Sequence, residues 1–157
     1  MLATPLQVRM AFPSSTLEAI ERAIAEAERE NRAEIRFAVE AALDMMPLLR
    51  GQTARARAIE VFSDLRVWDT EHNNGVLIYL LLADRDLEIV ADRGLSARVN
   101  PEEWARIALE MERRLAAGDY EAAVLEGIRS TARLLAKHFP ARSAPVERLP
   151  DKAVLIR

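Results

Sequence analysis

The 157-residue sequence contains no cysteine, only five glycines and only two histidines. Without cysteine the chain forms no disulfide and no thiolate metal site, and it has no cysteine nucleophile. Iron–sulfur and zinc-finger proteins are therefore excluded. The sequence also has no catalytic triad, no Cys/His metal box and no glycine-rich phosphate loop. It therefore predicts a fold more readily than an activity.

Long apolar runs and an excess of positive charge are missing as well. The longest uncharged apolar segment, residues 75–83, is well short of the roughly 20 residues that a membrane-spanning helix needs. The opening residues lack the long apolar stretch of a signal peptide. The formal net charge of −3 argues against a surface for nucleic acid. We therefore expect no membrane span, no nucleic-acid partner and a cytoplasmic protein.

Half of the residues are hydrophobic, which is enough for one domain with a substantial core. We predict that this domain covers residues 14–139 and that residues 140–157 form a C-terminal tail. Three prolines interrupt the tail, which ends in the β-prone Ala153-Val154-Leu155-Ile156. Such a tail packs on its own domain as an added edge strand, or it pairs with a second subunit.

Apolar residues recur at helical spacing in four segments, which predicts four main helices. The first covers residues 16–30, with Ser15 and Glu18 as a capping box. The second covers residues 52–66. The third begins with the N-cap Asn100 and Pro101, and the fourth runs from the cap Asp119 to about residue 138.

Two patterns indicate strands. Residues 34–42 alternate between apolar and charged side chains, which is typical of a half-buried strand at or near a sheet edge. Residues 75–83 are continuously apolar, as expected for a central strand covered on both faces. The helix between them makes these strands parallel, and the tight turn at residues 84–86 returns residues 87–91 antiparallel. We predict a three-layer α/β/α sandwich, an α/β fold with a small mixed sheet flanked by the four helices.

Strand direction gathers polar residues at both ends of this sheet. The end where the two parallel strands finish holds Asp44, Asp84, Arg85 and Asp86. Calcium and magnesium prefer carboxylate and amide oxygens. At the end before the central strand, the predicted ligands of Ca²⁺ or Mg²⁺ are Asp69, Glu71, Asn73 and Asp92. His72 and Arg93 are the predicted phosphate-binding residues there. The plainer alternatives are a solvated loop and a structural ion pair between Asp92 and Arg93.

Several segments together resemble the TPM domain family, which includes thylakoid lumen proteins and membrane-anchored bacterial proteins. They are the strand entry Glu34-Ile35, the segments Asn74-Gly75-Val76-Leu77 and Asp92-Arg93-Gly94-Leu95, then Gly118-Asp119-Tyr120 and Gly127. The resemblance covers residues 17–139 and implies the same three-layer fold. It implies either acid phosphatase activity and calcium binding or a role as an assembly, repair or accessory factor. Many family members have Gly-Tyr-Gly-Leu where this chain has residues 92–95.

Two functions follow as hypotheses. The first is a non-catalytic interaction or accessory module that binds a protein partner, or itself through the C-terminal tail, because no nucleophile and base converge in the sequence. The second is a metal-dependent acid phosphatase for small phosphomonoesters. In this hypothesis Asp69 and Asp92, with Glu71 as an additional candidate, hold the cation, and Arg93 or His72 binds the phosphate. No catalytic residue is assigned.

Overall fold

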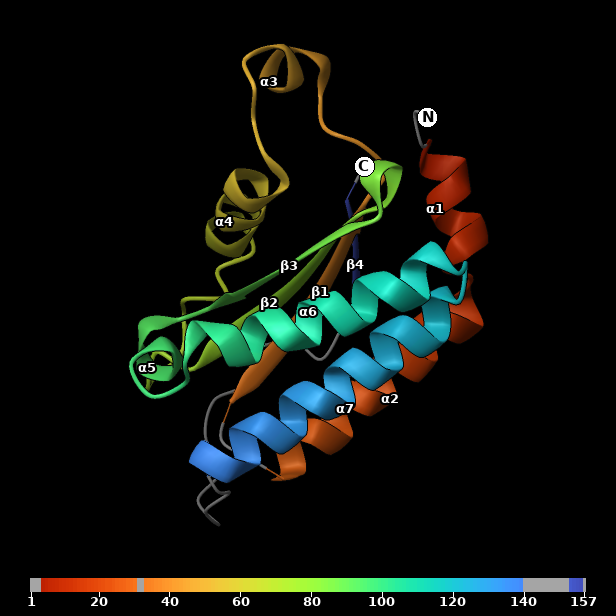
Figure 1. Ribbon diagram of the computed structural model, residues 1–157. Helices are drawn as coiled ribbons and strands as arrows, with labels where there is room; N and C mark the ends of the chain where they lie inside the picture. Colours follow the sequence, from red (N-terminus) through yellow and green to blue (C-terminus); the bar gives the residue numbers. More distant parts are fainter. Residues whose placement is uncertain (1–3, 31–32, 140–152, 157) are drawn as a thin grey trace.

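The computed structural model describes residues 4–30, 33–139 and 153–156. A four-stranded sheet lies between two helical layers, which confirms the predicted α/β/α sandwich (Figure 1). The larger layer covers one face of the sheet, and a single main helix covers the other. The larger layer consists of α2 (Ser14–Glu30), α6 (Pro101–Ala116) and α7 (Tyr120–His138), and the smaller one of α4 (Ala54–Asp64).

The strands follow the order β3-β2-β1-β4. The central pair, β1 (Glu34–Glu40) and β2 (Gly75–Leu81), is parallel, as the intervening helix predicts. β3 (Asp86–Ala91) returns antiparallel beside β2, with Ile89 opposite Ile78. β4 (Ala153–Ile156) lies parallel to β1 at the other edge. The last apolar residues of the chain therefore form an edge strand of the same sheet.

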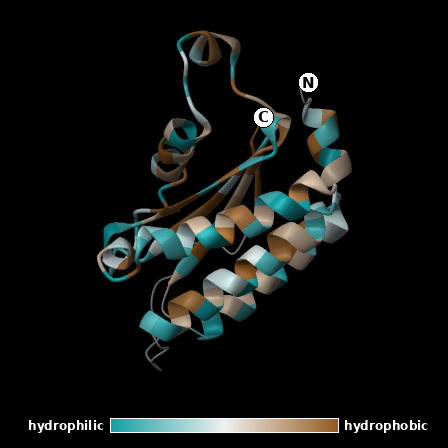
Figure 2. Cartoon of the chain, in the orientation of Figure 1, coloured by the Kyte–Doolittle hydropathy of each residue, from teal (hydrophilic) through white to brown (hydrophobic). Residues whose placement is uncertain are grey.

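β1 is buried on both faces, so the prediction of a half-buried strand is wrong. Ile35, Phe37 and Val39 belong to the larger core under α2, α6 and α7. The alternate residues face α4, where Ala38 packs in the smaller core and Glu40 is held by hydrogen bonds. Figure 2 shows the strands as the most continuously hydrophobic part of the chain.

All four main helices lie where the periodicity predicts them, although α2 begins two residues earlier than predicted and α4 is two residues shorter at each end. α2 begins at Ser14, so Ser15 lies inside the helix and the predicted capping box there is wrong. The backbone carbonyl of Pro13 already accepts the N–H of Leu17 at 3.0 Å. α6 does begin with a capping box, because the N–H of Asn100 donates to Glu103 at 3.2 Å.

Three short helices and a 3₁₀ turn were not predicted, because segments this short show no clear period. They are α1 (Pro5–Ala11), α3 (Met45–Leu49), α5 (Arg93–Ser96) and the 3₁₀ turn Leu82–Asp84. α1, α3 and the 3₁₀ turn lie at the end of the sheet where β1 and β2 finish, and α5 lies at the opposite end (Figure 1). No helix in the described part of the chain is long and apolar enough to cross a membrane.

Candidate functional site

The loop before β2 packs directly against the corner after β3, at the end where sequence patterns predict a metal. The N–H of Gly94 donates to the carbonyl of Asn73 at 2.9 Å, and the N–H of Asp92 donates to the carbonyl of Gly75 at 2.9 Å. A Cβ on Gly94 would collide with the backbone carbonyl oxygens of His72 and Asn73. Glycine is therefore required at position 94 for close backbone approach.

Two of the four predicted metal ligands at this end, Asp92 and Asp69, have structural partners of their own. Asp92 caps α5, because its Oδ1 accepts the N–H of Arg93 at 2.8 Å, while its Oδ2 is buried and has no hydrogen-bond partner among the described residues. Asp69 is exposed and pairs with Arg66 at 3.1 Å. Glu71 and Arg93 are exposed. Residues 4–30, 33–139 and 153–156 contain no group of three or more His, Asp or Glu placed to hold a metal.

A small cavity of about 210 Å³ lies at the same end. His72 lines it together with Asn74, Gly94 and Arg98. The guanidinium of Arg98 lies over the ring of Phe139, 5.2 Å from its centroid. Asp69, Glu71 and Arg93 do not line this cavity. His72 therefore lines this cavity without Asp69, Glu71 or Arg93, and the metal and phosphate assignments stay predictions.

The larger cleft, of about 630 Å³, lies at the opposite end of the sheet, where β1 and β2 finish. That end is where open α/β sheets commonly bind ligands. Of the four residues that the sequence places there, Asp84 and Arg85 line the cleft, whereas Asp44 and Asp86 do not. Sequence reasoning missed the other walls, because α1 was not predicted. They are Gln7, Met10 and Ala11 from α1, Leu82 and Ala83 from the 3₁₀ turn, and Tyr120 from the start of α7.

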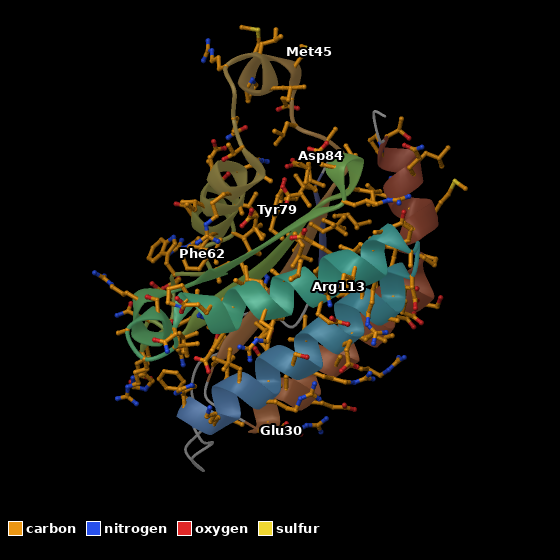
Figure 3. All side chains as sticks on the ribbon, viewed as in Figure 1. Glu30, Met45, Phe62, Tyr79, Asp84 and Arg113 are labelled. Atoms are coloured by element: carbon orange, nitrogen blue, oxygen red, sulfur yellow. The ribbon has the colours of Figure 1, made fainter. Side chains whose placement is uncertain are left out.

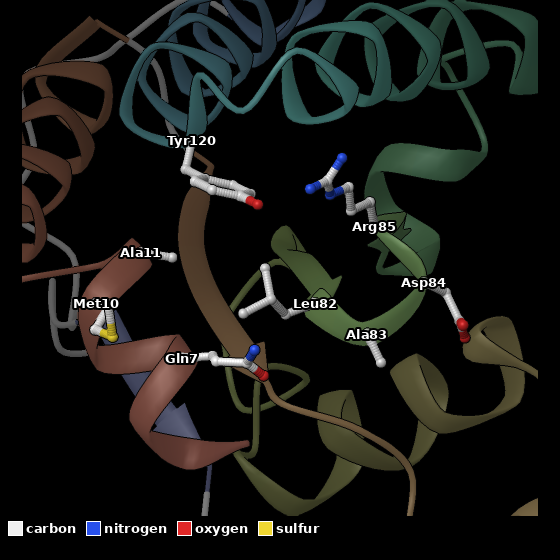
Figure 4. Close-up of a pocket in the computed structure, with 8 residues that line it drawn as sticks. All are labelled: Gln7, Met10, Ala11, Leu82, Ala83, Asp84, Arg85 and Tyr120. Atoms are coloured by element: carbon white, nitrogen blue, oxygen red, sulfur yellow. The ribbon is translucent and has the colours of Figure 1, made fainter. Parts of the chain in front are cut away.

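Hydrogen-bond donors converge in this cleft. Figure 4 shows the Arg85 guanidinium directed toward the Tyr120 hydroxyl, with the Asp84 carboxylate turned away from it. Arg85 donates to the carbonyl of Ala116 at 3.3 Å and pairs with no carboxylate in the described ranges. The Tyr120 hydroxyl makes no hydrogen bond to any described residue. The cleft therefore presents one positive charge and one free hydroxyl to a ligand.

Exposed apolar side chains surround the same end of the molecule. α3 projects from the body of the protein, and Met45 lies at its outer side (Figure 3). Leu49 on α3 and Met10 on α1 are each 72% exposed. We call the exposed α3 residues the α3 tip, which comprises Met45, Met46, Leu48 and Leu49. Apolar groups gathered in this way usually mark a surface that another molecule covers.

The smaller core contains a buried polar network. The Tyr79 hydroxyl donates to Glu40 at 2.7 Å, and Arg57 on α4 donates two hydrogen bonds to the same carboxylate, each 2.9 Å long. Burial and the hydrogen bond to Glu40 raise the pKa of Tyr79, so its hydroxyl stays protonated. The hydrogen bond to Glu40 also raises the pKa of Arg57. This network ties α4 to the sheet and leaves no group free for acid–base chemistry.

A second group of ionisable residues lies along the β3 edge. Burial raises the pKa of Asp86, Glu88 and Glu112, and the negative charges of nearby carboxylates raise it further. Arg55 offsets part of this repulsion through an ion pair with Glu88 at 3.5 Å. Folding therefore makes the negative charge of these three carboxylates less favourable.

The layers, strand order and loop packing together define an α/β/α domain with a small mixed sheet. The chain belongs to the TPM domain family, whose model matches residues 10–134. This confirms the family resemblance seen in the sequence.

The chain is similar to several solved structures, among them the following two, and no curated protein matches it. The BA42 protein from the psychrophilic bacterium Bizionia argentinensis is 26% identical with a TM-score of 0.81, over 92% of this chain and 94% of that one. The N-terminal domain of a protein from P. gingivalis is 15% identical with a TM-score of 0.65, over 90% of this chain and 95% of that one. The second likeness concerns the fold alone.

Proposed function

We propose that this TPM domain is a non-catalytic protein-interaction module that docks through the end of the sheet formed by α1, α3 and the large cleft. The distribution of exposed apolar residues carries this proposal. Nine large hydrophobic residues are exposed in the described chain, and two of them lie on α1 and four on α3. These six are Leu6 and Met10 on α1, and Met45, Met46, Leu48 and Leu49 on α3.

The chemistry of these residues supports a protein partner. Burying apolar surface contributes a favourable free energy of roughly 25 cal/mol per Å². Covering several Met and Leu side chains therefore contributes substantially to the free energy of binding. Methionine is unbranched and adapts its shape to the surface it contacts. A partner with an apolar contact face would therefore fit the α3 tip without rearrangement of the rest of the domain.

Substitutions in the α3 tip test the proposal. In the double variant Met46→Ser/Leu49→Ser, we expect the loss of proteins that the wild-type chain captures from its source cells. The thermal unfolding midpoint should not change, because both side chains are exposed. The matched control is Ile59→Ser/Leu109→Ser, which removes two exposed apolar residues elsewhere. Capture of the same proteins by the tip variant as by the wild type would contradict the proposal.

A metal-dependent phosphatase is the alternative proposal. The observation that favours it is the buried Oδ2 of Asp92, which has no hydrogen-bond partner among the described residues. Phosphomonoesterase assays with calcium, magnesium and manganese test it. Asp92→Asn is a suitable variant because asparagine caps a helix as well as aspartate does. The interaction module predicts no metal-dependent turnover. Turnover that needs a metal and is abolished by Asp92→Asn would contradict the interaction module and support the phosphatase.

A further inference from the structure

We propose that the large cleft binds the C-terminal carboxylate of a partner protein whose last residue is apolar. Arg85 and Tyr120 bind the carboxylate, while Leu82 and Met10 contact the terminal side chain. This inference rests on the proposed function, because it states which chemistry the partner presents to the docking end.

The charge in the cleft favours a carboxylate. Arg85 is the cation that lines it, and the guanidinium binds planar carboxylates through two parallel hydrogen bonds. Among the described residues its guanidinium donates one hydrogen bond, of 3.3 Å to the Ala116 carbonyl, which leaves most of its five N–H groups available. The Tyr120 hydroxyl, toward which the guanidinium points, adds another donor (Figure 4). Asp84, the carboxylate in the lining, is directed away.

Leu82, one of the two apolar contact residues, lies within one turn of this charge. The N–H of Arg85 donates to the carbonyl of Leu82 at 3.1 Å, so both residues belong to the same compact turn. In a peptide, the C-terminal carboxylate and the last side chain are bonded to the same Cα atom, and they can reach both features at once. A glutamate carboxylate lies at the end of a flexible side chain and would have to be ordered first. The cleft volume of about 630 Å³ suits a few terminal residues.

Binding of three small compounds, followed by ¹⁵N chemical shifts of the full chain, tests the inference. The first is an acetylated tetrapeptide that ends in leucine with a free carboxylate, the second is the same peptide as its C-terminal amide, and the third is hexanoate. We expect the free acid to bind at least about tenfold more tightly than the amide, as for loss of a charge-assisted hydrogen bond. Its binding should shift the amide signals of Arg85 and Tyr120. Hexanoate should bind more weakly than the free acid.

Variants identify the groups responsible. Arg85→Gln should abolish the preference for the free acid, and Tyr120→Phe should reduce it while keeping the ring contact with Phe12. Arg106→Gln removes an exposed arginine on α6 and should change nothing. Absence of binding by the free acid, equal binding of acid and amide, or a preference that survives Arg85→Gln would overturn the inference. If hexanoate bound more tightly than the free-acid peptide, the ligand of the cleft would be a free carboxylic acid, and the proposal of a protein C-terminus would be overturned.

This test is separable from that of the docking function. If the carboxylate preference is absent but the α3 tip variant loses its captured proteins, the results support the interaction module and contradict the carboxylate site. If the tip variant captures the same proteins as the wild type and the carboxylate preference is present, the results contradict the docking function and support a carboxylate site in the cleft.

Discussion

Glu40 is the residue on which the packing of α4 depends, since its carboxylate accepts hydrogen bonds from both the sheet and the helix. Tyr79→Phe removes one of these bonds and should lower the free energy of unfolding by about 1 kcal/mol. Glu40→Ala leaves both the Arg57 charge and the Tyr79 hydroxyl without their main partner and should cost about 3 kcal/mol. Urea unfolding at neutral pH measures both. Equal losses would show that the network contributes no more than one hydrogen bond.

Gly127 on α7 allows the close approach of α6. A Cβ at this position would collide with the side chain of Met111, which is 1% exposed in the core. Gly127→Ala should therefore destabilise the protein by about 1–3 kcal/mol, although alanine favours a helix. In the Met111→Ala background the same substitution should be neutral or stabilising, because the obstruction is gone. A double-mutant cycle by chemical unfolding measures this coupling, and purely additive effects would exclude it.

Single residues also show where sequence reasoning reaches its limit. In the segment Asn73-Asn74-Gly75, glycine is the residue that accepts a left-handed backbone most readily, but Asn73 adopts it, with φ 51°. Gly75 is needed for a different reason, because a Cβ there would collide with the backbone carbonyl of Val67. The left-handed backbone and the close approach to another segment are separate reasons for a glycine. Only the packing of the folded chain shows which of them applies at position 75.

Elements of three or more turns were predictable because their apolar residues recur often enough to define a period. This is why α2, α4, α6 and α7 and the continuously apolar β2 were found. α1 and α3 have seven and five residues, and most of their apolar side chains are exposed. Their sequences therefore show no buried apolar stripe at helical spacing. The large cleft was missed for the same reason, since α1 forms one of its walls.

The edge strand β4 gives a prediction at this scale. Its residues are half-buried and pair with β1 from Phe37 to Glu40. Deleting residues 153–157 should lower the free energy of unfolding by about 2–3 kcal/mol, because apolar surface and the β1 edge become exposed. Urea unfolding and light scattering measure stability and mass together. A truncated chain as stable as the wild type would contradict the contribution assigned to β4.

At the scale of the whole molecule, the negative charge along β3 makes stability depend on pH. Folding raises the pKa values of Asp86, Glu88 and Glu112, so the folded state favours their protonated forms. The stability that these protonated carboxyls contribute is fully present below their unfolded pKa and is lost as the pH rises through their folded pKa. Glu112→Gln should therefore stabilise the protein at about pH 7 and have little effect at about pH 4. Thermal unfolding at both pH values measures this. Glu18→Gln, an exposed carboxylate on α2, is the control; an equal gain in the control would contradict it.

The layered architecture and the family followed from the sequence because hydrophobic pattern and strand connection constrain the whole chain. The site did not, since polar residues that lie near each other along a loop can point to different partners. His72 lines a cavity, Asp69 pairs with Arg66 and Asp92 caps a helix, although all three come from the same end of the sheet. Local spacing predicts proximity but not the direction of each side chain.

The docking function is tested most directly by site-specific photo-crosslinking in the source cells. A photoreactive phenylalanine analogue replaces Leu49 in the α3 tip, and the same analogue replaces Leu109, which is 53% exposed on α6, in the control. A discrete adduct with another protein at position 49, and none at position 109, is the predicted result. No adduct at position 49, or the same adducts at both positions, would contradict a docking surface at this end of the molecule.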